Sequence, residues 1–190
     1  GGANKAAKYS THKLKEDLLR QKNDELLEAV LESNTPLAAK LLQSGAELDN
    51  AENKNGCRPL HIAAQKGDTK MLQYLLSWRP DLEVRTNLLK ITPLHSAVNA
   101  KSVDCVQILL DAGADFESQT DAGERPLHLA IMRMDAEIVQ VLLDFGANKV
   151  APCPCVWDSN VARSPLELAQ RLDPGIAESI VSILMGSHAR

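Results

Sequence analysis

Aromatic residues are scarce in this sequence, since only 3% of its 190 residues are Phe, Trp or Tyr. Leu, Ala, Val and Ile must therefore fill any core, and small aliphatic side chains suit helices that pack closely together. Apolar residues in total reach 44%, an ordinary share for a globular protein. The chain is long enough for one domain or one repeat array with a core of its own.

Long apolar stretches are also missing. No run approaches the ~20 residues that a membrane-spanning helix needs, and the first residues lack the charged, apolar and small-residue order of a secretory signal. We therefore expect no membrane partner. Because the chain starts with Gly-Gly rather than Met, we expect a fragment of a longer protein, whose targeting signal can lie outside it.

The cysteines lack the spacing pattern of a disulfide framework. They are Cys57, Cys105, Cys153 and Cys155. A core of this size needs no covalent staples, so this usage points to a reducing compartment, the cytosol or the nucleus. We therefore expect an intracellular protein.

Charge is distributed unevenly along the chain. The total is −4, but residues 1–22 carry six basic and two acidic side chains, which makes this arm +4 and the remaining residues −8. An acidic body is a poor match for phosphate backbones, so we expect no nucleic-acid partner. Residues 1–22 are predicted to form a basic N-terminal arm, partly helical or disordered, ahead of a domain at 23–190. Such an arm either contacts an acidic partner or forms a solvated helix face.

One motif recurs along the chain at nearly regular intervals, with a period of roughly 33 to 34 residues. Its copies read RPLHIAAQKGD, TPLHSAVNAKS, RPLHLAIMRMD and SPLELAQRLDP, and begin at Arg58, Thr92, Arg125 and Ser164. The last interval is longer than the others, so it contains an inserted loop. A second apolar segment, such as CVQILLDAGAD, follows the motif, and an earlier segment of this kind, LAAKLLQSGAELD, precedes the first copy.

The motif has the features of a helix start. Proline at the first helical position costs no hydrogen bond and brings a preset φ, and Thr92 or Ser164 can cap the helix that follows. Gly67 is placed to end the first helix of its repeat. Apolar residues in the second segment recur at helical spacing. Two short helices per unit cannot bury their apolar faces alone, so the units are predicted to stack.

The recurring TPLH motif and the LLDAGAD segment at 109–115 resemble the ankyrin repeat. The resemblance implies an all-α solenoid, in which helix–turn–helix units are joined by β-hairpin loops that point sideways. We expect about five repeats, the first and the last being atypical caps. Their approximate boundaries are 24–55, 56–89, 90–122, 123–150 and 163–185, with an insertion at 151–162.

Some residues depart from the repeat pattern. Lys101 and Met134 stand where glycine usually closes the first helix, so those helices are predicted to run longer or to tilt. Arg79 and Pro80 replace the Gly-Ala pair of the other repeats, which predicts a different end for that second helix.

His61, His95 and His128 occupy the same position in three successive repeats. Neighbouring repeats are separated by roughly 8–10 Å, whereas metal ligands must lie within about 2.3 Å of one ion. The three histidines therefore form a row rather than a metal site. The resemblance implies that they hydrogen-bond backbone groups and tie repeats together, and Glu167 replaces the histidine in the last repeat.

Cys153 and Cys155 lie in the inserted loop, close enough in sequence to share one metal ion. A structural zinc site needs about four ligands, and no third or fourth ligand is nearby in sequence. We therefore expect no metal or cofactor and interpret the segment as a plain loop; redox sensing is the alternative if a thiol is exposed and has a low pKa. No phosphate-binding loop, nucleophile elbow or paired-carboxylate motif is present, so the chain is not predicted to be an enzyme.

The remaining candidate for function is a binding surface. The resemblance implies that specificity lies in the hairpin tips and the exposed sides of the first helices. Two tips are polar, but the third contains Leu88, Leu89 and Ile91, which predicts an apolar patch. The other candidate partner-binding residues are Lys66, Asn99, Met132, Arg133 and Trp157. Alternatively, Leu88 or Leu89 packs on the neighbouring hairpin.

The sequence therefore predicts a non-catalytic module that binds a peptide or a domain surface of another protein, as a scaffold or adaptor. Three alternatives stay open. The chain regulates or inhibits an enzyme by docking to it, it is the substrate receptor of a ubiquitin ligase, or it senses a metal or redox state through Cys153 and Cys155.

Overall fold

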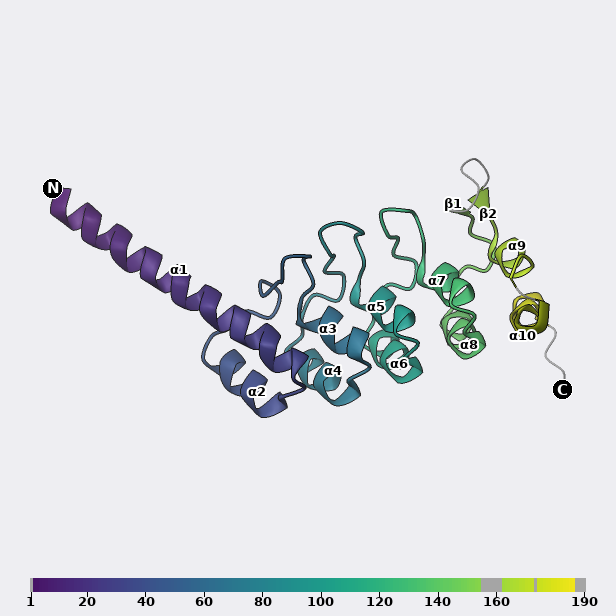
Figure 1. The fold of residues 1–190 in the computed structure, drawn as a ribbon, viewed down its shortest axis with the longest axis horizontal. Coiled ribbons are helices and arrows are strands. Elements are labelled where there is room, and N and C mark those ends of the chain that lie inside the picture. The colour runs from purple at the N-terminus through teal and green to yellow at the C-terminus, as the bar shows by residue number, and fades with distance from the viewer. Residues whose placement is uncertain (1, 155–161, 173, 187–190) are drawn as a thin grey trace.

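The computed structural model describes residues 2–154, 162–172 and 174–186, and in this part of the chain ten helices stack in five pairs (Figure 1). The first helices are α1 (Gly2–Leu31), α3 (Pro59–Lys66), α5 (Pro93–Asn99), α7 (Pro126–Met132) and α9 (Pro165–Ala169). The second helices are α2 (Thr35–Gln43), α4 (Thr69–Leu76), α6 (Val103–Asp111), α8 (Ala136–Asp144) and α10 (Pro174–Met185). In the described residues, no helix is both long enough and apolar enough to cross a membrane.

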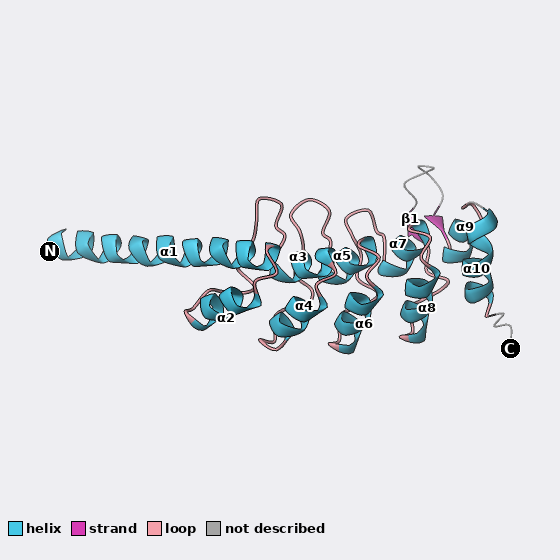
Figure 2. Cartoon of the chain, turned by 60° about the horizontal axis from the view of Figure 1, so that its bottom comes forward, coloured by secondary structure: helices cyan, strands magenta, loops and turns pink. Residues whose placement is uncertain are grey.

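The helices form two layers. Each first helix packs against the next first helix, and α4, α6 and α8 follow one another in the second layer. Figure 2 shows the loops between successive pairs projecting together on one side of both layers. The predicted solenoid of helix pairs joined by sideways loops is therefore confirmed.

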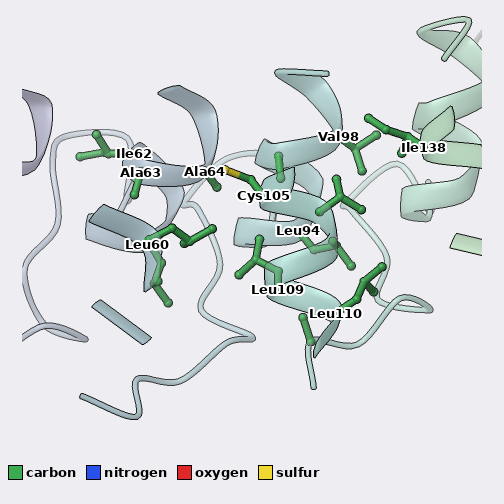
Figure 3. Close-up of a cluster of buried hydrophobic side chains, with 14 of the residues drawn as sticks. Leu60, Ile62, Ala63, Ala64, Leu94, Val98, Cys105, Leu109, Leu110 and Ile138 are labelled. Atoms are coloured by element: carbon green, nitrogen blue, oxygen red, sulfur yellow. The ribbon is translucent and has the colours of Figure 1, made fainter. Parts of the chain in front are cut away.

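One apolar cluster runs through the whole stack. The leucine after each motif proline is almost completely buried in the middle repeats, as are the leucines of the second helices that face it. Figure 3 shows Leu94 and Leu109 of the third repeat among apolar side chains of neighbouring repeats. Cys105 is fully buried in the same cluster and acts there as a small apolar residue. Small aliphatic side chains allow this close packing between layers.

Side-chain caps start the second helices α4, α6 and α8 and the first helices α5 and α9, whereas α3 and α7 follow an arginine that makes no side-chain cap hydrogen bond. Asp68, Ser102 and Asp135 each accept a hydrogen bond from the backbone N–H three residues later, at 3.0–3.4 Å. At the start of α9, the first helix of the last repeat, Ser164 and Glu167 form a reciprocal capping box. The Glu167 carboxylate accepts from the Ser164 N–H at 2.8 Å, and the Glu167 N–H donates to the Ser164 hydroxyl. The N–H and the hydroxyl of Ser164 both donate to this carboxylate and so lower the pKa of Glu167.

A left-handed residue follows the first helix of four repeats at the same position. Ser33, Gly67, Lys101 and Met134 have φ values of 57°, 66°, 55° and 55°. We expected longer or tilted helices at Lys101 and Met134. The longer helix is wrong, because α5 and α7 have 7 residues each, whereas α3, which Gly67 follows, has 8; the tilt stays a prediction. The repeat geometry requires the sharp turn, so these side chains adopt the conformation that glycine usually supplies.

Replacing Lys101 or Met134 by glycine should therefore stabilise the fold, by roughly 0.5–1 kcal/mol for each substitution. Both side chains are exposed, so little packing is lost. Thermal unfolding followed by circular dichroism measures the change. The matched variants Lys101→Ala and Met134→Ala keep the Cβ atom and should not gain stability; an equal gain with alanine would contradict the backbone explanation.

The second helix of the second repeat ends differently, as the sequence indicates. Arg79 takes the left-handed position with φ 54°, where Gly45, Gly113 and Gly146 have φ 95–99°. In those three repeats the alanine after glycine donates its N–H back to the helix at 3.0 Å. Pro80 has no N–H to donate, and α4 ends at Leu76 without this hydrogen bond.

Helix α1 continues without a break across residue 22, where the sequence suggested a boundary between arm and domain. The arm is thus the N-terminal part of the helix that belongs to the first repeat. Leu14 and Leu18 are 65% and 52% exposed on it. The Lys22 ammonium donates to the Ser44 carbonyl at 2.5 Å, which ties this region to the end of α2.

The insertion before the last repeat is closed by a short antiparallel pairing. Strand β1 (Cys153–Pro154) pairs with β2 (Ala162–Arg163), with Cys153 opposite Arg163. Cys155 and Trp157 lie outside the described residues.

Candidate protein-binding surface

The hairpin tip of the third repeat holds two leucines in solvent. Thr86 closes this loop, because its N–H donates to the Ile91 carbonyl and its hydroxyl accepts from the Ile91 N–H, both at 3.0 Å. Leu88 is 76% exposed and Leu89 is 58% exposed. Neither side chain packs away against the neighbouring hairpin, which was the alternative left open by the sequence.

Backbone hydrogen bonds join the three tips into a row. The Asn87 N–H donates to the Asn55 carbonyl of the preceding tip at 3.0 Å, and the Asp121 N–H of the following tip donates to the Leu89 carbonyl at 2.9 Å. The tip that carries the leucines is therefore held on both sides while its side chains stay exposed.

Beside Leu89 lies a groove of about 410 Å³, which we call the Leu89 groove. It is lined by Leu89, Ile91, Asn99, Thr120, Ala122, Glu124, Leu129, Met132 and Arg133. Leu129 is buried, whereas Ile91 and Met132 are half-buried and keep part of their surface in the groove. The structure thus brings together five of the predicted partner-binding residues.

A cation is held at the edge of the Leu89 groove. The Arg133 guanidinium donates from Nε and Nη2 to Asn99 Oδ1, at 3.1 and 2.9 Å. These bonds connect neighbouring repeats and orient the guanidinium, which stays exposed to solvent.

The other predicted partner-binding residues are placed differently. Leu88 lies on the same tip but does not line the groove. The Lys66 ammonium donates to the Leu31 carbonyl and to Ser33 Oγ, which ties it to the first repeat rather than to the leucine patch. Trp157 lies outside the described residues.

Four groove residues were not among the predicted partner-binding residues; they are Thr120, Ala122, Glu124 and Leu129. Thr120 occupies the same position in its repeat as Thr86, and its hydroxyl accepts from the Glu124 N–H at 3.2 Å. The repeat period was therefore a signal for Thr120. Leu129 follows the helix-start motif directly, and nothing in its local sequence marks it as a groove residue.

The three motif histidines share one hydrogen-bonding geometry. In each, Nδ1 accepts from the backbone N–H three residues earlier, at 3.1–3.3 Å. Nε2 lies 2.9 to 3.2 Å from a carbonyl of the next repeat or its loop, those of Ile91, Glu124 and Ala151. Since Nδ1 accepts, Nε2 must carry the proton and donate, so each ring is neutral.

Burial disfavours the charged form of the three imidazole rings. It lowers the pKa of both His61 and His95 to about 4, and it lowers the pKa of His128 as well. The rings are 0–1% exposed. The hydrogen bonds of the histidine rings link each repeat to the next, and they require the ring to be neutral.

The comparison with known families agrees with this recurring geometry. A family model described as Ankyrin repeats (3 copies) matches residues 26–120, and a second, described as Ankyrin repeat, matches residues 122–153. The chain belongs to the ankyrin repeat family.

Several proteins with ankyrin repeats are similar to parts of this chain. The putative palmitoyltransferase ZDHHC13 of Danio rerio is 40% identical over 96 residues, which cover 50% of this chain and 15% of that protein. Inversin of Canis lupus familiaris is 33% identical over 107 residues, covering 54% of this chain and 10% of that protein. Ankyrin repeat and SOCS box protein 2 of Bos taurus is 34% identical over 92 residues, covering 48% of this chain and 14% of that protein. The aligned region spans only 10–15% of these relatives.

Ankyrin repeats generally mediate protein–protein interaction and are generally not catalytic. Within residues 2–154, 162–172 and 174–186, no three His, Cys, Asp or Glu side chains gather as they would around a metal ion. Cys153 is only 1% exposed, so its thiol is covered, which is the opposite of what redox sensing requires. Its sequence neighbour Cys155 lies outside the described residues.

Three acidic residues of the ankyrin stack accept hydrogen bonds from the backbone. Asp49, Glu83 and Glu117 occupy the same position in successive repeats, and each carboxylate accepts the N–H of a residue in the following repeat or loop. Desolvation of the half-buried Glu83 raises the pKa of its carboxyl. These acids are part of the architecture, so charge available for a partner must be sought on other side chains.

Proposed function

We propose that this ankyrin repeat chain is a non-catalytic module that binds a peptide or a domain surface of another protein, and acts as a scaffold or adaptor. The concave face, formed by the hairpin tips and the exposed sides of the first helices, is the binding surface. The observation that carries the proposal is the exposure of Leu88 and Leu89 beside the Leu89 groove.

Exposed adjacent leucines favour binding for a simple energetic reason. Complete burial of one leucine side chain against a partner contributes roughly 1.5–3 kcal/mol. The backbone hydrogen bonds at Asn87 and Leu89 hold the tip in place, so little loop entropy is lost on binding. Met132 offers a flexible thioether that adapts to the partner's shape.

The class of partner follows from charge and shape. The −8 charge of residues 23–190 disfavours nucleic acid, and an apolar groove between ordered tips favours a peptide or a protein surface. The buried Cys105 thiol is compatible with a reducing compartment inside the cell, which is where we place the protein. Enzyme regulation and substrate reception in a ubiquitin ligase would both use the same binding step.

Leu88→Asp combined with Leu89→Asp should abolish partner capture and leave the thermal transition almost unchanged. Charged side chains at these positions stay hydrated in the free protein but cannot enter an apolar interface. The measurement is affinity capture from cells with quantitative mass spectrometry, together with thermal unfolding by circular dichroism.

The chain offers a matched control in Leu14→Asp combined with Leu18→Asp. These leucines are similarly exposed on α1 but do not line the Leu89 groove. The control variant should capture the same proteins as the wild type, whereas the tip variant should not capture them. Equal capture by the tip variant would refute the proposed site, and loss of the fold would show that the tip leucines stabilise the stack.

A further inference from the structure

A second groove lies on the same face, between α1 and the hairpin tips of the first repeats. We call it the α1 groove; its volume is about 960 Å³. Leu19, Leu27 and Leu31 of α1 contribute apolar surface to it, and Leu31 is 54% exposed. On the opposite side it is lined by residues of the loop between α2 and α3.

The two grooves meet at one hairpin tip. Asn87 lines the α1 groove, and Leu89, two residues further on, lines the Leu89 groove. Figure 2 shows the hairpin loops of successive repeats side by side in a row. A segment that lies along this row can therefore occupy both grooves without leaving the surface.

Charge differs between the two grooves. Five acidic and two basic side chains line the α1 groove; they are Glu16, Asp24, Glu28, Glu47 and Glu52, with Arg20 and Lys54. Glu52 pairs with Arg58 at 3.2 Å, and Glu47 accepts from Asn50 at 2.8 Å. In the described part of the chain the side chains of Asp24 and Glu28 make no such contact, and both are exposed. The Leu89 groove is lined by one charge of each sign instead. They are Arg133 at its edge and Glu124, whose carboxylate accepts from the Thr120 hydroxyl at 3.4 Å.

We propose that the concave face binds one extended segment, with an aliphatic or aromatic anchor in the Leu89 groove and lysine or arginine residues in the α1 groove. This inference rests on the proposed function, because the anchor uses the surface proposed there. Basic residues of the segment face Asp24 and Glu28, and their aliphatic stems cover the exposed part of Leu31. Arg133 disfavours the opposite placement, with basic residues beside the Leu89 groove.

The repeat spacing sets the distance between anchor and basic residues. Neighbouring first helices lie about 8–10 Å apart, and an extended chain advances about 3.3 Å per residue. One to two repeat spacings therefore correspond to about three to six residues. The basic residues stand at that separation from the anchor, on one side of it only.

A random dodecapeptide display library selected on the immobilised chain tests this arrangement. Enriched peptides should share an apolar anchor, with at least two Lys or Arg residues about three to six positions away on one side. A synthetic peptide from this selection should bind the variant Asp24→Lys with Glu28→Lys roughly tenfold more weakly at low salt. Selection on that variant should keep the anchor and lose the basic residues.

The matched control is Asp17→Lys with Glu32→Lys, which makes the same charge change at exposed positions on or just after α1 that do not line the groove. It should bind the synthetic peptide within about twofold of the wild type. Anchored peptides without basic residues, or equal weakening in both charge variants, would overturn the inference while the proposed function stands. No anchored peptides above the background of the Leu88→Asp, Leu89→Asp variant would overturn both.

Discussion

Lowering the pH from 7 to 5 should destabilise this ankyrin stack by about 4 kcal/mol through His61 and His95 alone. Each ring is buried, and its two nitrogens are committed to a backbone N–H and a backbone carbonyl. A second proton on the ring would remove the Nδ1 acceptor and place a charge in the core. The folded state therefore resists protonation.

The direction of the stability change with pH follows from the pKa of the rings in the unfolded and folded states. The pKa is 6.5 for an ordinary histidine and about 4 for His61 and His95 in the fold. Well above pH 6.5 neither the folded nor the unfolded state is protonated, so the contribution of these rings to stability is complete. Between pH 6.5 and 4 the unfolded chain takes up protons that the folded chain excludes, and stability falls by about 1.4 kcal/mol per pH unit for each ring. His128 acts in the same direction, whereas Glu83, with its raised pKa, acts in the opposite direction.

Urea unfolding at a series of pH values measures this effect. His95→Gln keeps a hydrogen-bond donor but cannot titrate, so the free energy of unfolding should fall at pH 7 while its slope against pH decreases by about one proton. An undiminished slope in His95→Gln would show that the acid sensitivity arises elsewhere.

Truncation of Leu109 to alanine should cost about 3–4 kcal/mol of stability, because it leaves a cavity in a core that cannot collapse to fill it. Leu109 is completely buried in the central repeat, in the same cluster as Leu94 and Cys105 (Figure 3). For a chain of this length such a loss corresponds to a fall of roughly 6–16 °C in the unfolding temperature.

Leu88→Ala is the matched comparison, since it makes the same chemical change at a side chain that is 76% exposed. It should change stability by less than about 0.5 kcal/mol. Calorimetry of the two variants gives both values. A large loss in Leu88→Ala would mean that this side chain packs on the protein, and would remove the basis for the proposed binding surface.

Because repeats are stabilised by their neighbours, Leu109→Ala is also expected to weaken the coupling between the two halves of the stack.

Most of the fold could be predicted because its signals are local and repeated. Proline at the first helical position, a capping residue before it and paired leucines in the second helix determine a helix pair within one repeat. Regular recurrence of this pair along the chain then requires stacking, since one pair cannot cover its own apolar face. The helix ends at Lys101 and Met134 were predicted less well, because the turn is imposed by neighbouring repeats and overrides local residue preference.

The candidate site could be predicted only in part. Five groove residues were foreseen from their equivalent positions in the repeats, but Lys66 was not separable from them by sequence. Its ammonium reaches Leu31 and Ser33, which lie in the preceding repeat, and that contact depends on how the first two repeats pack. Leu129 was missed because a residue can be buried in the core and still form the floor of a groove.

The sequence by itself determined the repeat, the pairing of helices within it, the position of the histidines and the presence of leucines in one hairpin tip, since each depends on residues close together in the chain. Only the tertiary structure decided that Leu88 and Leu89 face solvent, that Arg133 is oriented by Asn99, and that the acidic surface beside α1 adjoins the Leu89 groove. These features arise between repeats, where side chains from different units meet. Exposure and groove shape there depend on the spacing and packing of neighbouring repeats, which no single repeat contains.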